Sequence, residues 1–361
     1  MKQIGRRALA LVVVSAVSAV LLGVSGPAAS AREQDPDSRA RVAEARALMR
    51  AVYAGLRGRL ASGERPFRWS NDFFKGQSGT TYMPFTLTID RATIPAARVA
   101  VYVLATPHLD LTQNAGGAAP DNSAAERLEI PPPPAVAYEG VYFVDLNGDE
   151  AGDARRVRRA FSLPPGDYDI YVALAASRAS ESGSRPEPKD DDAKVMLIKQ
   201  EVSVPNLWST ELATSTVVVA ERVEPLAAPP APEERTSDPY ALDTVRIVPA
   251  GRADFQRTEQ PAVIFFVYNA GLTSERKPDV TVEYVLYRRG PDGDTTFSRT
   301  NRQNFNAQTL EGFDVDAGHQ LVGGQTMLLS EFPQGAYRLE IKVTDNTRRS
   351  TVIRDVDFAV R

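Results

Sequence analysis

The feature that most constrains the fold of this chain of 361 residues is a turn-and-strand signature that occurs twice. Residues 163–168 read LPPGDY, and residues 332–337 read FPQGAY. In each copy a proline presets the first turn position, a glycine closes the turn, and a run follows in which apolar and polar residues alternate. Such alternation is typical of a half-buried strand. The two copies predict two β domains of one kind.

The tyrosine that opens each of these strands, Tyr168 or Tyr337, resembles the tyrosine corner of immunoglobulin-like sandwiches. That resemblance implies a ring packed inside the sandwich and a hydroxyl that caps a neighbouring loop. The next residues, Asp169 and Arg338, are expected to point to the opposite face and to tolerate replacement by alanine.

The first 31 residues have the composition of a secretory signal peptide. Three basic residues lie within the first seven positions, residues 8–24 carry no charge, and Ala29 and Ala31 supply the small side chains that a signal peptidase recognises. We expect export with cleavage after Ala31, and a periplasmic, cell-surface or extracellular location. An uncleaved N-terminal anchor stays open as an alternative, and Arg6-Arg7 partly matches a twin-arginine export signal.

Cysteine is absent, which excludes disulfides, thiolate chemistry and a lipoprotein anchor. With the three basic residues of the signal removed, 39 basic residues remain against 46 acidic ones. This acidic balance disfavours nucleic acid as a partner of the whole chain. After signal cleavage no apolar stretch is long enough to span a membrane.

The mature chain is predicted to be all-β, with two immunoglobulin-like antiparallel β-sandwich domains and a short N-terminal α-helix. Residues 32–64 form a polar start and an amphipathic helix over about 38–60. Its apolar positions predict a helix docked on the first sandwich, with a dimer seam as the alternative; these positions are Val42, Ala45, Met49, Val52 and Leu56.

The first sandwich is expected over residues 65–223, with mobile, low-complexity inserts near 106–134 and 176–192. Residues 224–239 are rich in proline and predict a semi-rigid linker, and residues 240–361 form the second sandwich. The predicted strands are 85–90, 98–104, 136–146, 156–163, 167–174, 194–204 and 215–222, then 244–248, 262–268, 280–288, 295–300, 326–329, 336–345 and 351–360.

Residues 263–271 and 280–284 resemble the Asn-x-Gly turn and following strand of bacterial adhesion-related and fibronectin-III-like modules. The resemblance implies an extracytoplasmic binding or spacer module without catalysis, and it carries no site residues across.

Asp145, Asn147, Asp149 and Asp153 have the spacing of oxygen ligands in a calcium-binding loop. The pattern fails further on, because Arg156 occupies the position of the bidentate glutamate of an EF-hand. Since turns favour Asp, Asn and Gly without any metal, a plain hairpin loop is the favoured interpretation and no metal site is assigned.

Two further segments could bind a partner. Arg155, Arg156, Arg158 and Arg159 alternate between strand faces, which favours a charged sheet edge over a polyanion contact. The aromatic segment is either the first half of a sandwich core or a platform for sugars; it contains Phe67, Trp69, Phe73, Phe74, Tyr82 and Phe85.

No catalytic constellation is recognisable. The two histidines, His108 and His319, are expected in loops, and Ser78 lacks the strand-turn-helix context of a nucleophile. We therefore expect no enzyme activity, no cofactor and no catalytic residue. The favoured function is a secreted, non-enzymatic binding, adhesion or spacer protein of the bacterial cell envelope, with a protein or an envelope polymer as partner. A carbohydrate-binding or accessory module of envelope hydrolysis is the alternative, and an enzyme with an unrecognised carboxylate site is the third. The sequence does not define the oligomeric state.

Overall fold

The computed structural model describes residues 36–59, 66–108, 135–146, 150–151, 154–177, 194–231 and 234–361. The proposed signal peptide, and most of the two low-complexity inserts, lie outside the described residues. The chain divides into two compact units. Among described residues, the first unit falls within Met1–Pro66, Arg91–Gly148 and Asp169–Gln200, and the second within Phe67–Asp90, Asp149–Tyr168 and Glu201–Arg361.

Strands and one long helix make up the described chain, which confirms the all-β prediction with a short N-terminal helix. The helix is α1 (Pro36–Ala54), which continues into a π-helical turn, η2 (Gly55–Arg59). The strands associate in four sheets. Among the pairs with a defined register, the pair of β14 (Asp254–Phe255) with β21 (Ser350–Val360) is parallel and the others are antiparallel.

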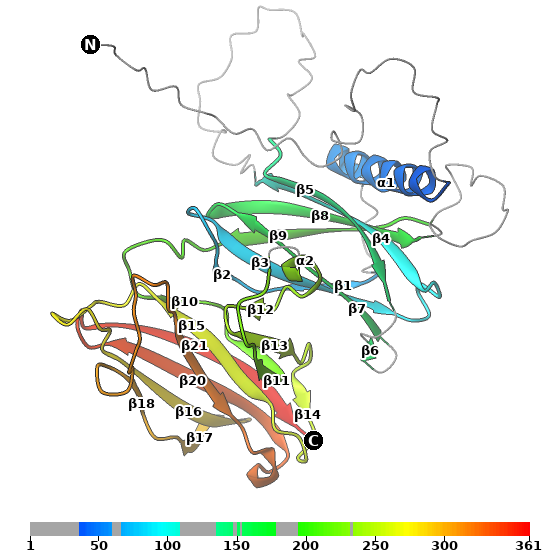
Figure 1. Ribbon diagram of the computed structural model, residues 1–361. Coiled ribbons are helices and arrows are strands. Elements are labelled where there is room, and N and C mark those ends of the chain that lie inside the picture. The colour runs from blue at the N-terminus through cyan, green and yellow to red at the C-terminus, as the bar shows by residue number, and fades with distance from the viewer. Residues whose placement is uncertain are drawn as a thin grey trace, which may run out of the picture. The chain divides into compact units, whose positions relative to one another are not determined.

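In the first unit, α1 covers one face of a four-stranded sheet (Figure 1). The strand order is β5 (Tyr138–Asp145), β4 (Arg98–Pro107), β8 (Gly166–Ala176) and β9 (Met196–Val204). Leu48 and Val52 of α1 are fully buried and pack against Ala100, Tyr102 and Ala173, which confirms a helix docked on a sheet.

The buried stripe of α1 differs from the predicted one. Leu48 lies at its centre, whereas Val42 remains 44% exposed and Met49 is only partly buried. Since Ala, Met, Val and Leu occupy much of the helix circumference, apolar spacing alone locates this stripe poorly.

The second unit contains three sheets. One joins β1 (Arg68–Asn71), β2 (Phe74–Lys75), β3 (Thr81–Asp90), β7 (Ala154–Leu163) and β6 (Glu150–Ala151). Another joins β12 (Ala241–Leu242), β13 (Val245–Pro249), β11 (Val218–Pro225), β15 (Ala262–Tyr268), β10 (Ala213–Thr214) and β19 (Leu321–Thr326). The last contains β14, β21, β20 (Gly335–Asp345), β16 (Val280–Gly290), β17 (Gly293–Arg299) and β18 (Gln303–Phe305).

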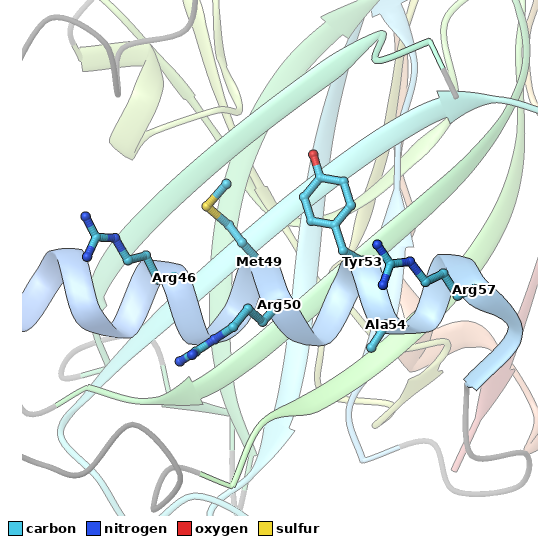
Figure 2. Close-up of a pocket in the computed structure, with 6 residues that line it drawn as sticks. All are labelled: Arg46, Met49, Arg50, Tyr53, Ala54 and Arg57. Atoms are coloured by element: carbon cyan, nitrogen blue, oxygen red, sulfur yellow. The ribbon is translucent and has the colours of Figure 1, made fainter. Parts of the chain in front are cut away.

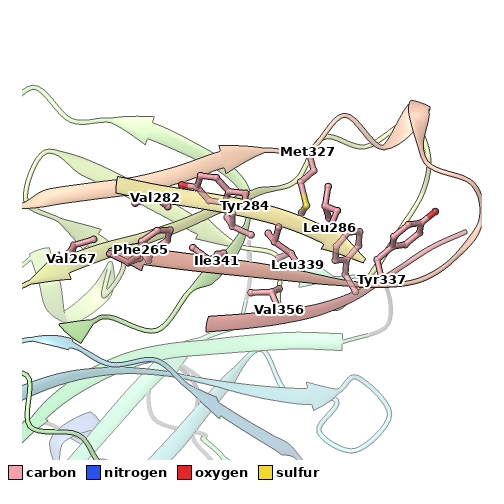
Figure 3. Close-up of a cluster of buried hydrophobic side chains, with 14 of the residues drawn as sticks. Phe265, Val267, Val282, Tyr284, Leu286, Met327, Tyr337, Leu339, Ile341 and Val356 are labelled. Atoms are coloured by element: carbon pink, nitrogen blue, oxygen red, sulfur yellow. The ribbon is translucent and has the colours of Figure 1, made fainter. Parts of the chain in front are cut away.

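The last two sheets pack face to face as a sandwich (Figure 3). Phe265 and Val267 from β15 meet Val282 and Tyr284 from β16 in its interior. Along β20 every second side chain from Tyr337 to Asp345 is buried, so the predicted alternation is confirmed.

The strand predicted at residues 215–222 belongs to this sandwich and not to the preceding one. It corresponds to β11, which pairs with β15 on one edge and with β13 on the other. The start of the predicted linker is also strand, because Glu224 and Pro225 pair with Arg246 and Val245. The linker further contains a short helix, α2 (Glu234–Ser237). The predicted boundary at residues 223–240 therefore divides a continuous sheet.

The outer face of the same sheet is covered within the second unit by residues from the N-terminal half. Phe74 contacts Phe266 with ring centroids 5.8 Å apart, and Phe73, Tyr82 and Tyr240 join the same apolar cluster. The Phe73 amide donates to Thr216 Oγ1 at 2.8 Å. The described packing consequently links residues 67–90 to the C-terminal sandwich.

Both tyrosine corners are present. The Tyr168 hydroxyl donates to the Pro164 carbonyl at 3.0 Å, and the Tyr337 hydroxyl donates to the Pro333 carbonyl at 2.6 Å. Tyr337 is fully buried and Tyr168 nearly so. The predicted role of each tyrosine, ring inside and hydroxyl on a turn carbonyl, is confirmed.

Candidate functional site

The outward face of α1 carries a row of arginines, which we call the arginine face: Arg39, Arg46, Arg50 and Arg57. At about 100° per residue, the three members of this row that belong to α1, at positions 39, 46 and 50, fall within about 40° of one another around the helix axis, and Arg57 follows in the π-helical turn. They lie opposite Leu48, which is buried against the sheet. Docking of the apolar stripe thus directs the arginines outward.

Apolar side chains accompany the arginines on this surface. Figure 2 shows Arg46, Met49 and Tyr53 on one side of the helix axis, with Arg50 and Ala54 on the other. Tyr53 is 38% exposed. Met49, however, packs partly against the core beneath the helix, and Tyr53 hydrogen-bonds with the buried Tyr102, so both side chains also contact the sheet side of α1.

The remaining charges of α1 are directed differently. Ser177 Oγ donates to Glu44 Oε2 at 2.7 Å, and the Arg41 guanidinium lies 5.5 Å from the centre of the Phe143 ring. Glu44 is therefore held by the residue that follows β8.

The candidate calcium loop is described only in part. Asn147, Asp149 and Asp153 lie outside the described residues. Asp145 is exposed and accepts a 2.7 Å hydrogen bond from Arg98 Nε, which holds the pKa of that carboxyl below its usual value. Asp145, the first of the proposed calcium ligands, is therefore already paired with Arg98.

The arginine run lies on β7, which pairs with β3 along its whole length and with β6 at its first two residues. Arg156 is buried, and its Nη2 donates to the Ala250 carbonyl at 2.9 Å. A Cβ at the adjacent Gly251 would lie 3.2 Å from this guanidinium. Arg156 thus serves packing within the second unit, a role that strand alternation alone did not indicate.

The aromatic segment forms core. Phe67, Phe74 and Phe85 are buried, and Trp69 stacks on Phe85 with ring centroids 4.5 Å apart. Its indole Nε1 donates to Asn71 Oδ1 at 2.9 Å. These contacts favour the core interpretation over a sugar platform for the six residues.

The exposed tryptophan is Trp208, which the sequence analysis did not single out. It is 43% exposed, its Nε1 donates to the Thr80 carbonyl at 2.8 Å, and Lys75 Nζ lies 4.4 Å from the ring centre. Burial lowers the pKa of Lys75. The indole is held in place with part of its surface open to solvent, and no local sequence signal distinguishes it from a core tryptophan.

The histidines are engaged in separate places. His108 Nδ1 lies 2.8 Å from Asp169 Oδ1, and Lys199 Nζ lies 3.0 Å from the same oxygen. A metal ion bound to this pair would have to displace Lys199. Asp169 therefore bears two interactions, which the expectation that it tolerates replacement by alanine did not take into account. His319 Nδ1 accepts a hydrogen bond from the Asp314 amide at 3.0 Å and so stabilises its own loop. Ser78 lies in the turn between β2 and β3 with φ of 52°.

Two carboxylates hold loops together, Asp345 in the interior and Asp72 at a partly buried position. Asp345 is fully buried and accepts from the amides of Gly271, Thr347 and Arg348 at 2.6, 2.9 and 3.0 Å. Asp72 accepts from the Tyr240 hydroxyl at 2.6 Å; burial raises the pKa of Asp72 to about 6, and that hydrogen bond partly opposes the shift. Both groups use their oxygens in structural bonds.

No family model and no curated protein matches this chain. The solved structures that it matches include a mutant of alpha-2-macroglobulin from Salmonella, at 13% sequence identity and a TM-score of 0.18. The match covers 83% of this chain but only 17% of the length of that protein. A TM-score this low does not establish a shared fold and says nothing about function.

Proposed function

We propose that this chain is an exported, non-enzymatic binding or spacer protein of the bacterial cell envelope, built from immunoglobulin-like modules. The observation that carries the proposal is the arginine face of α1, a basic outward surface on a chain that is acidic overall. Leu48 and Val52 dock this helix on a sheet, and a scaffold that presents a charged surface is suited to recognition. The N-terminal segment with its signal-like composition supports export.

The arrangement of the polar residues supports a function without catalysis. His108, Asp72 and Asp345 each bind groups that stabilise the fold. Among the described residues, no helix is long and apolar enough to cross a membrane.

The experiment that tests this proposal is fractionation of cells that produce the full chain. We expect the protein in the envelope fraction with Arg32 as its first residue. Purified mature protein should also capture a component of its own envelope, identified by mass spectrometry. A cytoplasmic chain that begins at Met1 would overturn the proposal, and a membrane-bound chain that begins at Met1 would replace the cleaved form with an anchored one.

Carbohydrate binding is the second candidate, now through Trp208 and not through the buried aromatic segment. An exposed indole fixed by a hydrogen bond to Thr80 can stack on a sugar ring. Titration of the protein with envelope glycans, followed by tryptophan fluorescence, tests it. The response should disappear in Trp208→Phe, whereas a response that persists in this variant would exclude Trp208 as the platform.

A further inference from the structure

The loop of residues 205–212 holds Trp208 in a fixed position within the second unit. Trp208 Nε1 donates to the Thr80 carbonyl at 2.8 Å, and the Trp208 amide donates to Asn206 Oδ1 at 3.0 Å. Asn269 Nδ2 fastens the same loop, because it donates to two of the loop's carbonyls at 3.2 and 3.0 Å. An indole that is 43% exposed is therefore preorganised for a partner.

Lys75 brings a positive charge to this indole. Its Nζ lies 4.4 Å from the centre of the Trp208 ring and 5.9 Å from that of Tyr268, and it donates to Asn269 Oδ1 at 3.0 Å. Within the residues that the structure describes, these are the partners of the ammonium group, and none of them is a carboxylate. Burial lowers the pKa of Lys75. Lys75 is consequently a partly buried cation whose charge no described side chain balances.

We propose that Trp208 and Lys75 together bind a hexuronic acid residue of an envelope glycan. This inference rests on glycan binding at Trp208, the second candidate function, and it names the class of sugar and the residue that selects it. The C–H face of a sugar ring stacks on the indole, and the carboxylate of the same sugar balances the charge of Lys75.

The spacing of the two side chains fits a single sugar residue. An ammonium–carboxylate hydrogen bond is about 2.8 Å long, so a carboxylate bound to Lys75 Nζ lies within roughly 7 Å of the centre of the Trp208 ring. In a hexuronic acid the carboxylate is bonded directly to the sugar ring. That ring can therefore cover the exposed part of the indole while its carboxylate reaches Lys75.

Charge complementarity favours an acidic sugar over a neutral sugar and over an acidic peptide. A neutral sugar would stack on Trp208 but would leave the charge of Lys75 unbalanced. An acidic peptide would balance that charge, but its carboxylates lie at the ends of flexible side chains, whose ordering costs free energy. A hexuronic acid satisfies both groups with one rigid ring.

The ion pair should give the acidic sugar an advantage that depends on salt. A hydrogen bond between charged groups should strengthen binding roughly 10- to 100-fold over the uncharged sugar. Raising the salt from about 0.1 M to about 1 M shortens the Debye length from roughly 10 to 3 Å. Because Lys75 keeps partial exposure, this advantage should decrease at high salt, whereas stacking on Trp208 should persist.

The test is calorimetric titration of the mature chain, from Arg32 onward, with oligomers of galacturonic acid and of glucuronic acid. The methyl esters of the same oligomers have the same rings without the charge. At least one of the two acids should bind about 10- to 100-fold more tightly than its ester.

Two variants separate the roles of the side chains. Lys75→Met removes the charge and keeps a side chain of similar length, so the acid and its ester should then bind within about threefold of each other. Trp208→Ala removes the indole, and the acid and the ester should both bind about tenfold more weakly. The thermal midpoint verifies that each variant is folded.

Matched controls exist for the protein and for the ligand. Lys342 on β20 has a side chain that is 44% exposed, so Lys342→Met removes the same charge at another surface and should leave the preference for the acid unchanged. Hexaglutamate carries a charge similar to that of a uronic acid hexamer but has no ring to stack. It should bind at least about tenfold more weakly than the hexamer.

Four results would overturn the proposal: no binding of either acid, equal binding of acid and ester by the parent chain, an unchanged preference for the acid in Lys75→Met, or hexaglutamate binding as tight as that of the acid. If acid and ester bind equally and both depend on Trp208, selection of the acid fails and glycan binding at Trp208 stands. If neither sugar binds while the protein is still recovered from the envelope fraction, the uronic acid inference fails and the proposed envelope function stands.

Discussion

The hydroxyl of Tyr337 donates a hydrogen bond of 2.6 Å to the carbonyl of Pro333, four residues earlier in the chain. Tyr168 and Pro164 repeat this relationship at 3.0 Å. The intervening glycines also agree, with φ of +151° at Gly335 and +149° at Gly166. Each tyrosine thus connects the interior beneath its strand to the turn that precedes it, and the two sequence copies form the same local structure.

Loss of the Tyr337 hydroxyl should destabilise the C-terminal sandwich. Tyr337→Phe keeps the ring but leaves the Pro333 carbonyl without its donor, and we expect a loss of about 1–3 kcal/mol in the free energy of unfolding. Tyr337→Ala also creates a cavity beside Phe332 and Phe358, so its cost should reach about 3–5 kcal/mol. Denaturant unfolding of the mature chain measures both changes.

Tyr287→Phe is the matched control for the hydroxyl. Tyr287 pairs with Arg338 across β16 and β20, on the face opposite the sandwich interior, and is only partly buried. We expect a change within about 0.5 kcal/mol. If Tyr287→Phe and Tyr337→Phe destabilise the protein equally, the corner hydrogen bond has no special contribution.

Arg338 should contribute to stability, which corrects the expectation that its replacement would be neutral. Its side chain points away from the core as predicted, but its guanidinium bonds Asp294 at 2.8 Å and Asp355 at 2.6 Å and lies 4.3 Å from the centre of the Tyr287 ring. These carboxylates raise the pKa of Arg338. We expect Arg338→Ala to cost about 1 kcal/mol at low salt, and less at high salt, because exposed ion pairs are screened. A cost that does not depend on salt would assign the effect to packing alone.

Protonation of Asp72 should stabilise the folded chain at mildly acidic pH. Burial raises its pKa from 3.8 to about 6, so the folded state binds more protons than the unfolded state between these values. This contribution is complete below pH 3.8 and disappears as the pH rises through 6. Because Asp72 keeps partial exposure, we expect its contribution to unfolding free energy to fall by about 1 kcal/mol between pH 5 and pH 7.5.

The variant Asp72→Asn isolates this contribution. Asparagine keeps an oxygen that can accept from Tyr240 but does not titrate in this range. The difference in stability between wild type and variant should therefore change with pH, with the variant relatively more stable at pH 7.5 than at pH 5. Parallel pH profiles would show that Asp72 is solvated in the folded state.

The strand β20 was predictable because it shows a local period of two from Tyr337 to Asp345. The strand predicted at residues 326–329 was wrong, since β19 ends at Thr326 and Leu329–Glu331 form a 3₁₀ turn. The pairing of β11 with β15 was not predictable, since it joins Val218 to Ile264 and depends on contacts that no local pattern records. The proline-rich composition after residue 225 also suggested a domain boundary, although Leu226 still donates to the Thr244 carbonyl at 2.7 Å.

The candidate site was less predictable than the fold. The sequence located α1 and its amphipathic character. It did not show which side of the helix packs on the sheet, because alanines are interspersed among the four arginines, and only the burial of Leu48 defines that side. For Trp208 and Arg156, the sequence did not predict the exposure of the side chain. Exposure of an indole and burial of a guanidinium are decided by distant residues, Thr80 and Ala250, which sequence spacing does not reveal.

Truncated fragments test at which residue the independently folding C-terminal domain begins. Residues 240–361 were expected to fold alone, but that fragment lacks β11, which lies between β13 and β15 in the sheet. Without it, β13 keeps only its pairing with β12 and β15 only its pairing with β19, and Val218 and Ala220 no longer cover Ile247 and Ile264. We expect residues 240–361 to show no cooperative thermal transition.

Residues 206–361 retain β10, β11 and Leu212, so the interior of the C-terminal sandwich is complete in that fragment. We expect it to unfold cooperatively, but at a lower temperature than the full chain, because Phe73, Phe74 and Tyr82 no longer cover Phe266. This fragment should fold without residues 67–90. A peptide of residues 67–90 should raise the thermal midpoint of the fragment if the two bind. A shorter fragment that melts as cooperatively as the longer one would show that β11 is dispensable and would restore the domain boundary after residue 223.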